Sequence, residues 1–249
     1  MKLKILTKGL FLLGLLSINL SASEHKILPH WGYTEKSSPE NWSKLSPAFQ
    51  TCSNGANQSP INLVNPIETN LSEIALDYNS TSTEIINNGH TIQVNIAKGS
   101  TINIDGINFE LKQFHFHTPS ENNINGKSFP LEAHFVHASK DGKLAVIGLM
   151  FQKGIENKAL QEFWDKMPMK SGDKITITTK NFKNLLPRNR DYYRFNGSLT
   201  TPPCTEGVRW IVMKEAKSIS KKQIERFAKL IGYPNNRPIQ PINARVVIK

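Results

Sequence analysis

The sequence feature that most constrains the fold is an alternation of polar and aromatic residues, Gln-Phe-His-Phe-His, at positions 113–117. Side chains alternate between the two faces of a β-strand, so His115 and His117 share one face and the phenylalanines occupy the other. A second segment, residues 131–137, repeats this period and carries His134 seventeen positions after His117. If the two strands pair, three imidazoles converge and leave one position of a tetrahedral metal ion open.

The alternation also has a simpler interpretation, in which a half-buried strand turns its histidines to solvent and its phenylalanines to the core. The chain has only seven histidines, however, and four of them lie in these two short segments. The helical zinc-protease motif His-Glu-x-x-His does not occur in the sequence, so strands have to carry any ligand pair. The spacing therefore favours a metal site of the open, catalytic type.

Residues 1–22 have the features of a secretory signal peptide. Three lysines precede a short apolar run, residues 9–16, and small residues follow as far as Ser23. The run is too short to span a membrane comfortably, and the rest of the sequence holds no second candidate. We therefore expect a cleaved signal, a mature catalytic domain of residues 23–249, no stable membrane anchor, and export, most simply to a periplasm.

The formal net charge is +11, but the lysines are scattered along the chain rather than clustered. Scattered lysines are typical of a solvated basic surface, and no nucleic-acid-binding motif accompanies them, so we expect no nucleic-acid partner. The length that remains after the signal fits one domain with a sizeable core.

The two cysteines, Cys52 and Cys204, favour a single long-range disulfide in a chain bound for an oxidising compartment. In the loop-entropy account such a closure stabilises the fold by roughly 4–5 kcal/mol. Two alternatives remain open at this point: a pair of buried free thiols, or Cys204 as a metal ligand.

Short strand signals dominate from residue 84 onward and predict a mostly β domain with few short helices around one large, mainly antiparallel twisted sheet. Asp105 and Gly106 form a typical tight hairpin turn. The apolar run 144–151 is typical of a strand buried on both faces. Further strands are expected at residues 174–179, 208–213 and 244–248.

Two amphipathic segments, residues 156–167 and 220–231, predict the helices, with Ser220 as the N-cap of the second. Residues 23–62 are rich in proline, serine, asparagine and tryptophan and predict irregular structure on the surface.

The segment 196–210, Asn-Gly-Ser-Leu-Thr-Thr-Pro-Pro-Cys-Thr-Glu-Gly-Val-Arg-Trp, carries a family resemblance. Together with His-Trp-Gly-Tyr at 30–33, Gln-Ser-Pro-Ile-Asn at 58–62, Asn-Asn-Gly-His at 87–90 and the three histidines, it closely resembles the α-class carbonic anhydrases. The resemblance implies that family's fold and a zinc lyase that converts CO2 and water reversibly into bicarbonate and a proton. It also implies one Zn²⁺ per chain on His115, His117 and His134, a zinc-bound hydroxide as nucleophile, and a monomer or homodimer.

The resemblance assigns further roles around the zinc. Gln113 and Glu132, which also have matching strand parity, resemble the family's hydrogen-bonding partners of His115 and His134, while a backbone carbonyl near the C-terminus would hold the third ring. Thr200 would orient the hydroxide and donate its own proton to Glu121. The two threonines could otherwise be ordinary loop residues before Pro-Pro.

His90 falls at the position of the family's proton shuttle, for which an imidazole with a pKa near 6.5 is well suited. The alternative is an exposed histidine after a turn glycine. His137, on the strand face opposite His134, is expected to be structural.

CO2 is small and apolar, so its site should be an apolar wall beside the metal. The positions that match the family's pocket are Val136, Val146, Leu199, Val208 and Trp210, with Thr201 nearer the bicarbonate product. Each of these apolar residues could equally be core. The family also includes non-catalytic binding proteins that lack zinc histidines, whereas this chain keeps all three.

Overall fold

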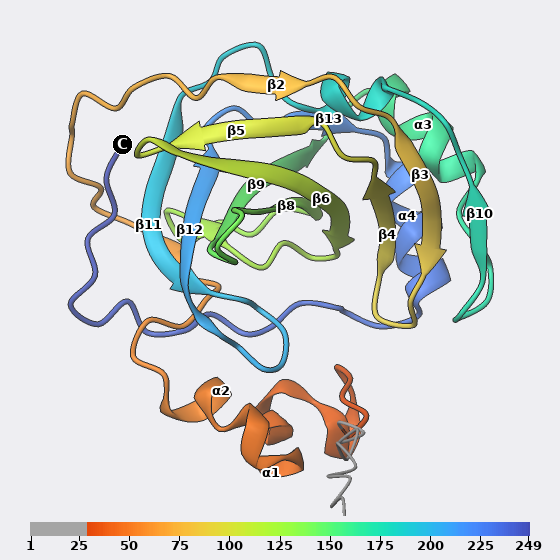
Figure 1. The fold of residues 1–249 in the computed structure, drawn as a ribbon. Helices are drawn as coiled ribbons and strands as arrows, with labels where there is room; N and C mark the ends of the chain where they lie inside the picture. Colours follow the sequence, from red (N-terminus) through yellow and green to blue (C-terminus); the bar gives the residue numbers. More distant parts are fainter. Residues whose placement is uncertain (1–28) are drawn as a thin grey trace, which may run out of the picture.

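This computed structural model describes residues 29–249 of the chain. A twisted sheet of eleven strands, which lie between residues 76 and 219, forms the centre of the fold (Figure 1). The expected signal peptide, residues 1–22, lies outside the described residues. The strands are β2 (Leu76–Tyr78), β3 (Ser82–Asn87), β4 (Ile92–Ile96), β5 (Ser100–Ile104), β6 (Ile107–His117), β8 (Leu131–Ala138), β9 (Leu144–Lys153), β10 (Lys174–Thr176), β11 (Tyr192–Ser198), β12 (Glu206–Met213) and β13 (Lys217–Ile219).

The sheet follows the order β10-β3-β4-β6-β8-β9-β12-β11, with β5 also paired to β6, β2 to β5 and β13 to β9. Most neighbours are antiparallel, and β12 and β13 run parallel to β9. A separate short ladder joins β1 (Asn62–Leu63) to β7 (Asn123–Ile124). The predicted mostly β, mainly antiparallel sheet is therefore confirmed.

Local sequence signals explain several of these strands. Asp105 and Gly106 both adopt positive φ, 54° and 75°, as a tight turn between β5 and β6 requires. The apolar run in β9 is buried without interruption from Ala145 to Phe151, because both faces of this central strand are covered.

Helices α3 (Lys158–Asp165) and α4 (Lys221–Ile231) correspond to the two predicted helices. The first begins later than predicted because the side chain of Asn157 caps it, accepting a hydrogen bond from the backbone N–H of Leu160, and it ends two residues early, at Asp165. Ser220 caps α4 as expected, within a capping box completed by Gln223.

Two predictions of local structure are wrong. Residues 244–248 form only isolated bridges at Ile248, because Asn243 adopts φ 51° and the Arg245 side chain turns back onto nearby carbonyls. The expected strand 174–179 ends at Thr176.

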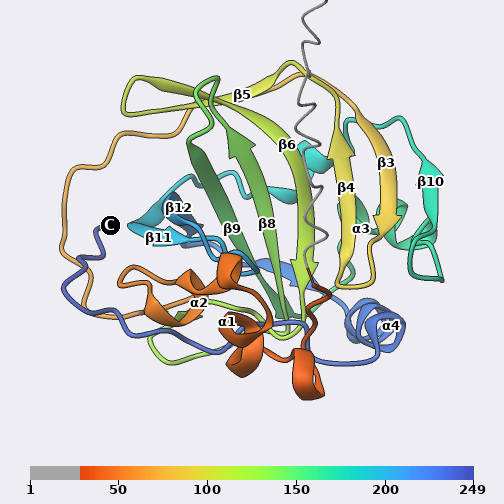
Figure 2. The same ribbon diagram turned by 60° about the horizontal axis from the view of Figure 1, so that its bottom comes forward.

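The N-terminal arm is also more regular than predicted, with short helices α1 (Trp42–Leu45) and α2 (Thr51–Asn54) and three 3₁₀ turns, Glu35–Ser37, Pro39–Asn41 and Pro47–Phe49. A further 3₁₀ turn spans Asn181–Leu185. The arm lies along one side of the domain (Figure 2). No helix of the described residues is long and apolar enough to cross a membrane.

The two faces of the central strands have different surroundings. Phe114, Phe116 and Phe135 pack in the main core, which α3 and α4 cover. The opposite face carries the histidines and a second apolar cluster around Trp210. The alternation that predicted these strands thus separates a packed core from a polar site.

Cys52 and Cys204 form a disulfide, with sulfur atoms 2.08 Å apart. The bridge is buried against Trp42 and Phe49 of the arm, so it joins the arm to the turn that follows Thr200. This confirms the predicted pairing and rules out both free thiols and Cys204 as a metal ligand.

Candidate metal centre and active site

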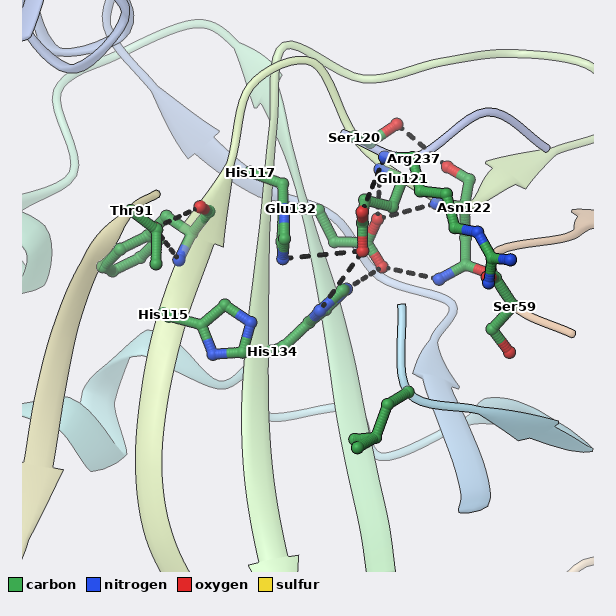
Figure 3. A network of polar contacts seen from close by, with 12 residues as sticks. Ser59, Thr91, His115, His117, Ser120, Glu121, Asn122, Glu132, His134 and Arg237 are labelled. Carbon is green, nitrogen blue, oxygen red and sulfur yellow. Dashed lines mark hydrogen bonds and ion pairs between the residues drawn. The ribbon is translucent and has the colours of Figure 1, made fainter. Parts of the chain in front are cut away.

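Strands β6 and β8 bring three histidines together, because His115 lies directly opposite His134 and His117 opposite Glu132. One ring nitrogen from each histidine lies within 4.8 Å of the other two (Figure 3). His117 and His134 are each only 1% exposed, and His115 is half-buried. The alternation of side chains along these two strands therefore brings the three histidines together, as the sequence predicted.

Each imidazole also has an acceptor on its outer side. His115 Nδ1 lies 2.9 Å from Gln113 Oε1, and His117 Nδ1 donates to the backbone carbonyl of Asn235 at 2.7 Å. His134 Nε2 lies 3.0 Å from Glu132 Oε1. With one nitrogen of each ring directed outward, the other is left for the centre of the cluster.

The protonation state of these rings suits a cation. Burial lowers the pKa of all three histidines, and holds those of His115 and His134 well below the ordinary value, so the three rings are neutral at neutral pH. The buried Nε2 of His117 has no hydrogen-bond partner among the described residues. Three neutral imidazoles with inward nitrogens fit Zn²⁺, which in catalytic sites takes three protein ligands and leaves a fourth position for water.

Glu132 is a buried carboxylate held by several N–H groups. Its Oε2 accepts from the backbone N–H of Glu121 at 2.8 Å and of Asn122 at 2.9 Å, and its Oε1 accepts from the Asn122 amide at 2.9 Å. Burial raises the pKa of Glu132 to about 7, while the hydrogen bonds from Asn122 oppose that rise. The carboxylate is thus fixed in place beside His134.

Glu121 is likewise fully buried, next to the histidines. Its Oε1 accepts from the Arg237 backbone N–H at 2.8 Å, and its Oε2 lies 3.5 Å from His117 Nε2. Burial raises the pKa of Glu121 to about 8, and the neighbouring Thr200 hydroxyl opposes this rise. Oε2 makes no hydrogen bond of good geometry with any described residue, so it is available to a partner at the centre of the site.

The five expected pocket residues lie in one apolar cluster, which the structure places beside the histidines. Trp210 packs edge-on to the His134 ring, with centroids 4.9 Å apart, and its indole N–H donates to the carbonyl of Ser198. Within this larger cluster Val146, Val208 and Trp210 are buried, and Val136 and Leu199 are partly buried. Thr201 is partly buried in the turn closed by the hydrogen bond from Cys204 N to its carbonyl.

His90 lies on the turn between β3 and β4, where the Asn88 side chain accepts hydrogen bonds from the backbone N–H groups of His90 and Thr91. Its ring stacks on Trp31, with centroids 3.9 Å apart and planes 7° from parallel. Partial burial, and to a smaller extent His30, lowers the pKa of His90. Its Nδ1 has no hydrogen-bond partner among the described residues.

Sequence reasoning missed three buried polar residues that support the site: Asn122, Asn235 and Arg237. The Arg237 guanidinium, 2% exposed as a residue, donates to the Gln58 side chain and to the carbonyls of Ser59 and Cys52. A polar residue inside an otherwise unremarkable loop gives no periodic signal, so nothing in the sequence singles out Arg237.

Comparison with known proteins defines the class to which this fold and site belong. The family model for eukaryotic-type carbonic anhydrases matches residues 37–249. A carbonic anhydrase of Pectobacterium carotovorum is 47% identical over 235 residues, which cover 94% of this chain and 96% of that protein. One from Neisseria gonorrhoeae is 46% identical over 230 residues, with 92% and 91% covered.

The solved structure of an α-carbonic anhydrase from Thermovibrio ammonificans with the inhibitor sulfanilamide superposes with a TM-score of 0.84. The two chains are 48% identical, and the match covers 88% of this chain and 99% of the other. The chain therefore belongs to the α-class carbonic anhydrase family, and it is an enzyme of that class.

Proposed function

We propose that His115, His117 and His134 bind one Zn²⁺ ion and that the enzyme uses this site to interconvert CO2 and bicarbonate. The observation that carries the proposal is the set of three neutral ring nitrogens within 4.8 Å of one another. When bound, zinc supplies Lewis acidity that lowers the pKa of a water molecule from about 15.7 to about 7, as is known for this family. At about 1.36 kcal/mol per pKa unit, the ion stabilises hydroxide relative to water by roughly 12 kcal/mol.

Gln113, Glu132 and the carbonyl of Asn235 keep the three imidazoles in the orientation that the metal requires. Each acceptor faces the outer nitrogen of one ring and selects the tautomer whose other nitrogen carries the lone pair. A negative ligand is absent from the proposed set, so the charge of the ion is not reduced by its protein ligands.

Thr200 and Glu121 orient the attacking oxygen. The Thr200 hydroxyl accepts a hydrogen bond from that oxygen and donates one to the carboxylate of Glu121, whose Oε2 faces the centre of the site. This relay admits only a ligand that can donate to Thr200. It directs a lone pair toward the carbon of CO2 and leaves Thr201 nearer the bicarbonate product.

The apolar residues bind CO2 by excluding water rather than by hydrogen bonds. Their side chains form one cluster beside His134, and a small apolar molecule gains from burial against such a wall. The residues proposed for this role are Val136, Val146, Leu199, Val208 and Trp210.

His90 then carries the proton that CO2 hydration releases to bulk solvent. Its ring stacks on Trp31, and the side chain as a whole is partly exposed on the turn between β3 and β4, so the ring can exchange a proton with solvent water. An imidazole accepts a proton near neutral pH far better than water does.

We also propose that residues 1–22 are cleaved and that residues 23–249 act outside the cytoplasm, in a periplasm, as monomer or homodimer. The disulfide between Cys52 and Cys204 supports an oxidising location. N-terminal sequencing of the periplasmic fraction and light scattering of the purified protein test the two parts of this proposal.

Stopped-flow CO2 hydration, with metal analysis before and after treatment with a zinc chelator, tests the main proposal. We expect one zinc per chain, fast hydration, loss of both on chelation and recovery on adding Zn²⁺. Equal rates with and without bound zinc would overturn it.

A further inference from the structure

Asn235 is completely buried, in the segment that follows α4, and uses every polar group it has. Its carbonyl accepts from His117 Nδ1 at 2.7 Å, and its backbone N–H donates to the Thr118 carbonyl at 3.2 Å. Its side-chain oxygen accepts from the Thr118 N–H at 2.8 Å. Its amide nitrogen donates to the carbonyls of His90 at 3.0 Å and Phe116 at 2.9 Å.

These contacts join two parts of the proposed active site that are far apart in the chain. The contacts with Phe116 and Thr118 flank the zinc-site residue His117 on both sides. The contact with His90 holds the backbone of the turn that carries the proposed proton shuttle. Thr91, next to His90, donates to the same Phe116 carbonyl, so the turn and the end of β6 meet at this point (Figure 3).

Only an amide satisfies this combination of partners. One acceptor meets the Thr118 N–H while two hydrogens on a single nitrogen meet the two carbonyls. An alanine in this position removes the partner of the buried Thr118 N–H and one partner each of the His90 and Phe116 carbonyls. Buried polar groups that lack hydrogen bonds lower the stability of the fold. The Asn235 carbonyl would then be free to shift away from His117, because its own side chain no longer anchors it.

We propose that the Asn235 side chain is a positioning residue that couples the zinc ligand His117 to the His90 turn. One amide thereby fixes both the metal ligand and the proton acceptor in relation to each other. This inference rests on the proposed function, in which His117 binds zinc and His90 shuttles protons.

The variant Asn235→Ala tests the coupling through two separate measurements. We expect zinc transfer to a chelator to become at least about tenfold faster, as for other residues that orient metal ligands. We also expect CO2 hydration in weak buffer to fall further than hydration in concentrated imidazole buffer, because the His90 turn is displaced. In Asn235→Ser, whose hydroxyl replaces one contact, both effects should be smaller, and this variant decides the question if the alanine variant does not fold.

Asn157→Ala is the matched control. Asn157 is also a buried asparagine, 8% exposed, whose side chain caps α3 and donates to the Ser218 carbonyl, and it contacts neither the histidines nor the His90 turn. We expect this variant to lower the melting temperature while leaving zinc release and buffer dependence as in the wild type.

Zinc release that is unchanged in both Asn235 variants, or changed only as much as in Asn157→Ala, would overturn the inference. An unaltered buffer dependence would equally remove the coupling to His90. A wild-type protein that binds zinc without hydrating CO2 contradicts the proposed function instead, and the zinc-release comparison then still decides whether Asn235 positions His117.

Discussion

The three histidines of the proposed zinc site and His90 have different surroundings. His115, His117 and His134 stand on paired strands, and each ring has a protein acceptor beside its outer nitrogen. His90 stands on a turn, half-buried, with its ring against Trp31 and its Nδ1 without a partner among the described residues.

The difference in surroundings matches the two proposed roles, metal binding for the three histidines and proton transfer for His90. A metal ligand has to stay in one orientation, so acceptors that fix its tautomer strengthen binding. A proton carrier has to exchange its proton with solvent, and the partly exposed His90 meets that requirement better than the buried His117 and His134 do. The backbone of the His90 turn is nevertheless held firmly, by Asn88 and Asn235.

The largest expected effect comes from His134→Ala. Removing one of three neutral ligands should release zinc and, with it, the roughly 12 kcal/mol by which the ion favours deprotonation of water. We expect zinc content near zero and CO2 hydration at the detection limit, measured by metal analysis and stopped flow on folded protein. A variant that retains both zinc and activity would remove His134 from the metal site.

Thr200→Ala should lower kcat/KM for CO2 hydration by about 100-fold while zinc stays bound, because one oriented hydrogen bond to the reacting oxygen is lost. Thr200→Ser is the matched control, since it keeps the hydroxyl and should keep most of the activity. Similar losses in the two variants would show that the hydroxyl is not what matters.

Glu132→Ala should speed zinc release by about 10–100-fold, whereas Gln113→Ala should have a smaller effect. Glu132 is fully buried and held by three N–H groups, while Gln113 is partly exposed, so water can replace the Gln113 side chain but not the carboxylate. Chelator competition measures both rates. Equal release rates would contradict the role given to this buried carboxylate.

The paired strands of the site could be predicted because their signal is local. The alternation at 113–117 and 131–137 sets which side chains share a face, and the buried run in β9 needs no partner to be recognised. The β-branched run 246–248 looked like a strand for the same reason. There the backbone turns at Asn243, and the Arg245 side chain donates to two nearby carbonyls and to the carbonyl of Asn196, 49 positions away.

The supporting polar residues could not be predicted, because their role depends on contacts across the fold. Asn122 meets Glu132 ten positions away and Ile61 sixty-one positions away, and Asn235 meets His90 across 145 positions. An isolated asparagine has no periodicity and is equally common in surface turns. Such residues become visible only when burial and partners are known.

His90→Ala should slow turnover by about tenfold in weak buffer and leave zinc content unchanged, since positioned proton transfer is worth at least this much. Added imidazole should restore part of the rate. His30→Ala is the control, because His30 is exposed and stacks on His90 only at 5.8 Å between centroids. A His90 variant without any buffer effect would move the shuttle elsewhere.

Replacing His137 should affect catalysis less than replacing any of the other histidines compared above. It lies on β8 with His134 but on the opposite face, 2.6 Å from the Tyr78 hydroxyl in the core. Burial lowers the pKa of His137 to about 3, and the Ala145 carbonyl opposes this shift.

Between pH 6.5 and 3 the unfolded chain therefore binds a proton at residue 137 that the folded chain does not, so stability falls as the pH falls. From neutral pH to pH 5 the loss should be about 2 kcal/mol. In His137→Gln this part of the pH dependence should disappear, while CO2 hydration stays close to wild type. Denaturant unfolding at the two pH values measures the difference, and parallel losses in the two proteins would show that His137 is not the group that titrates.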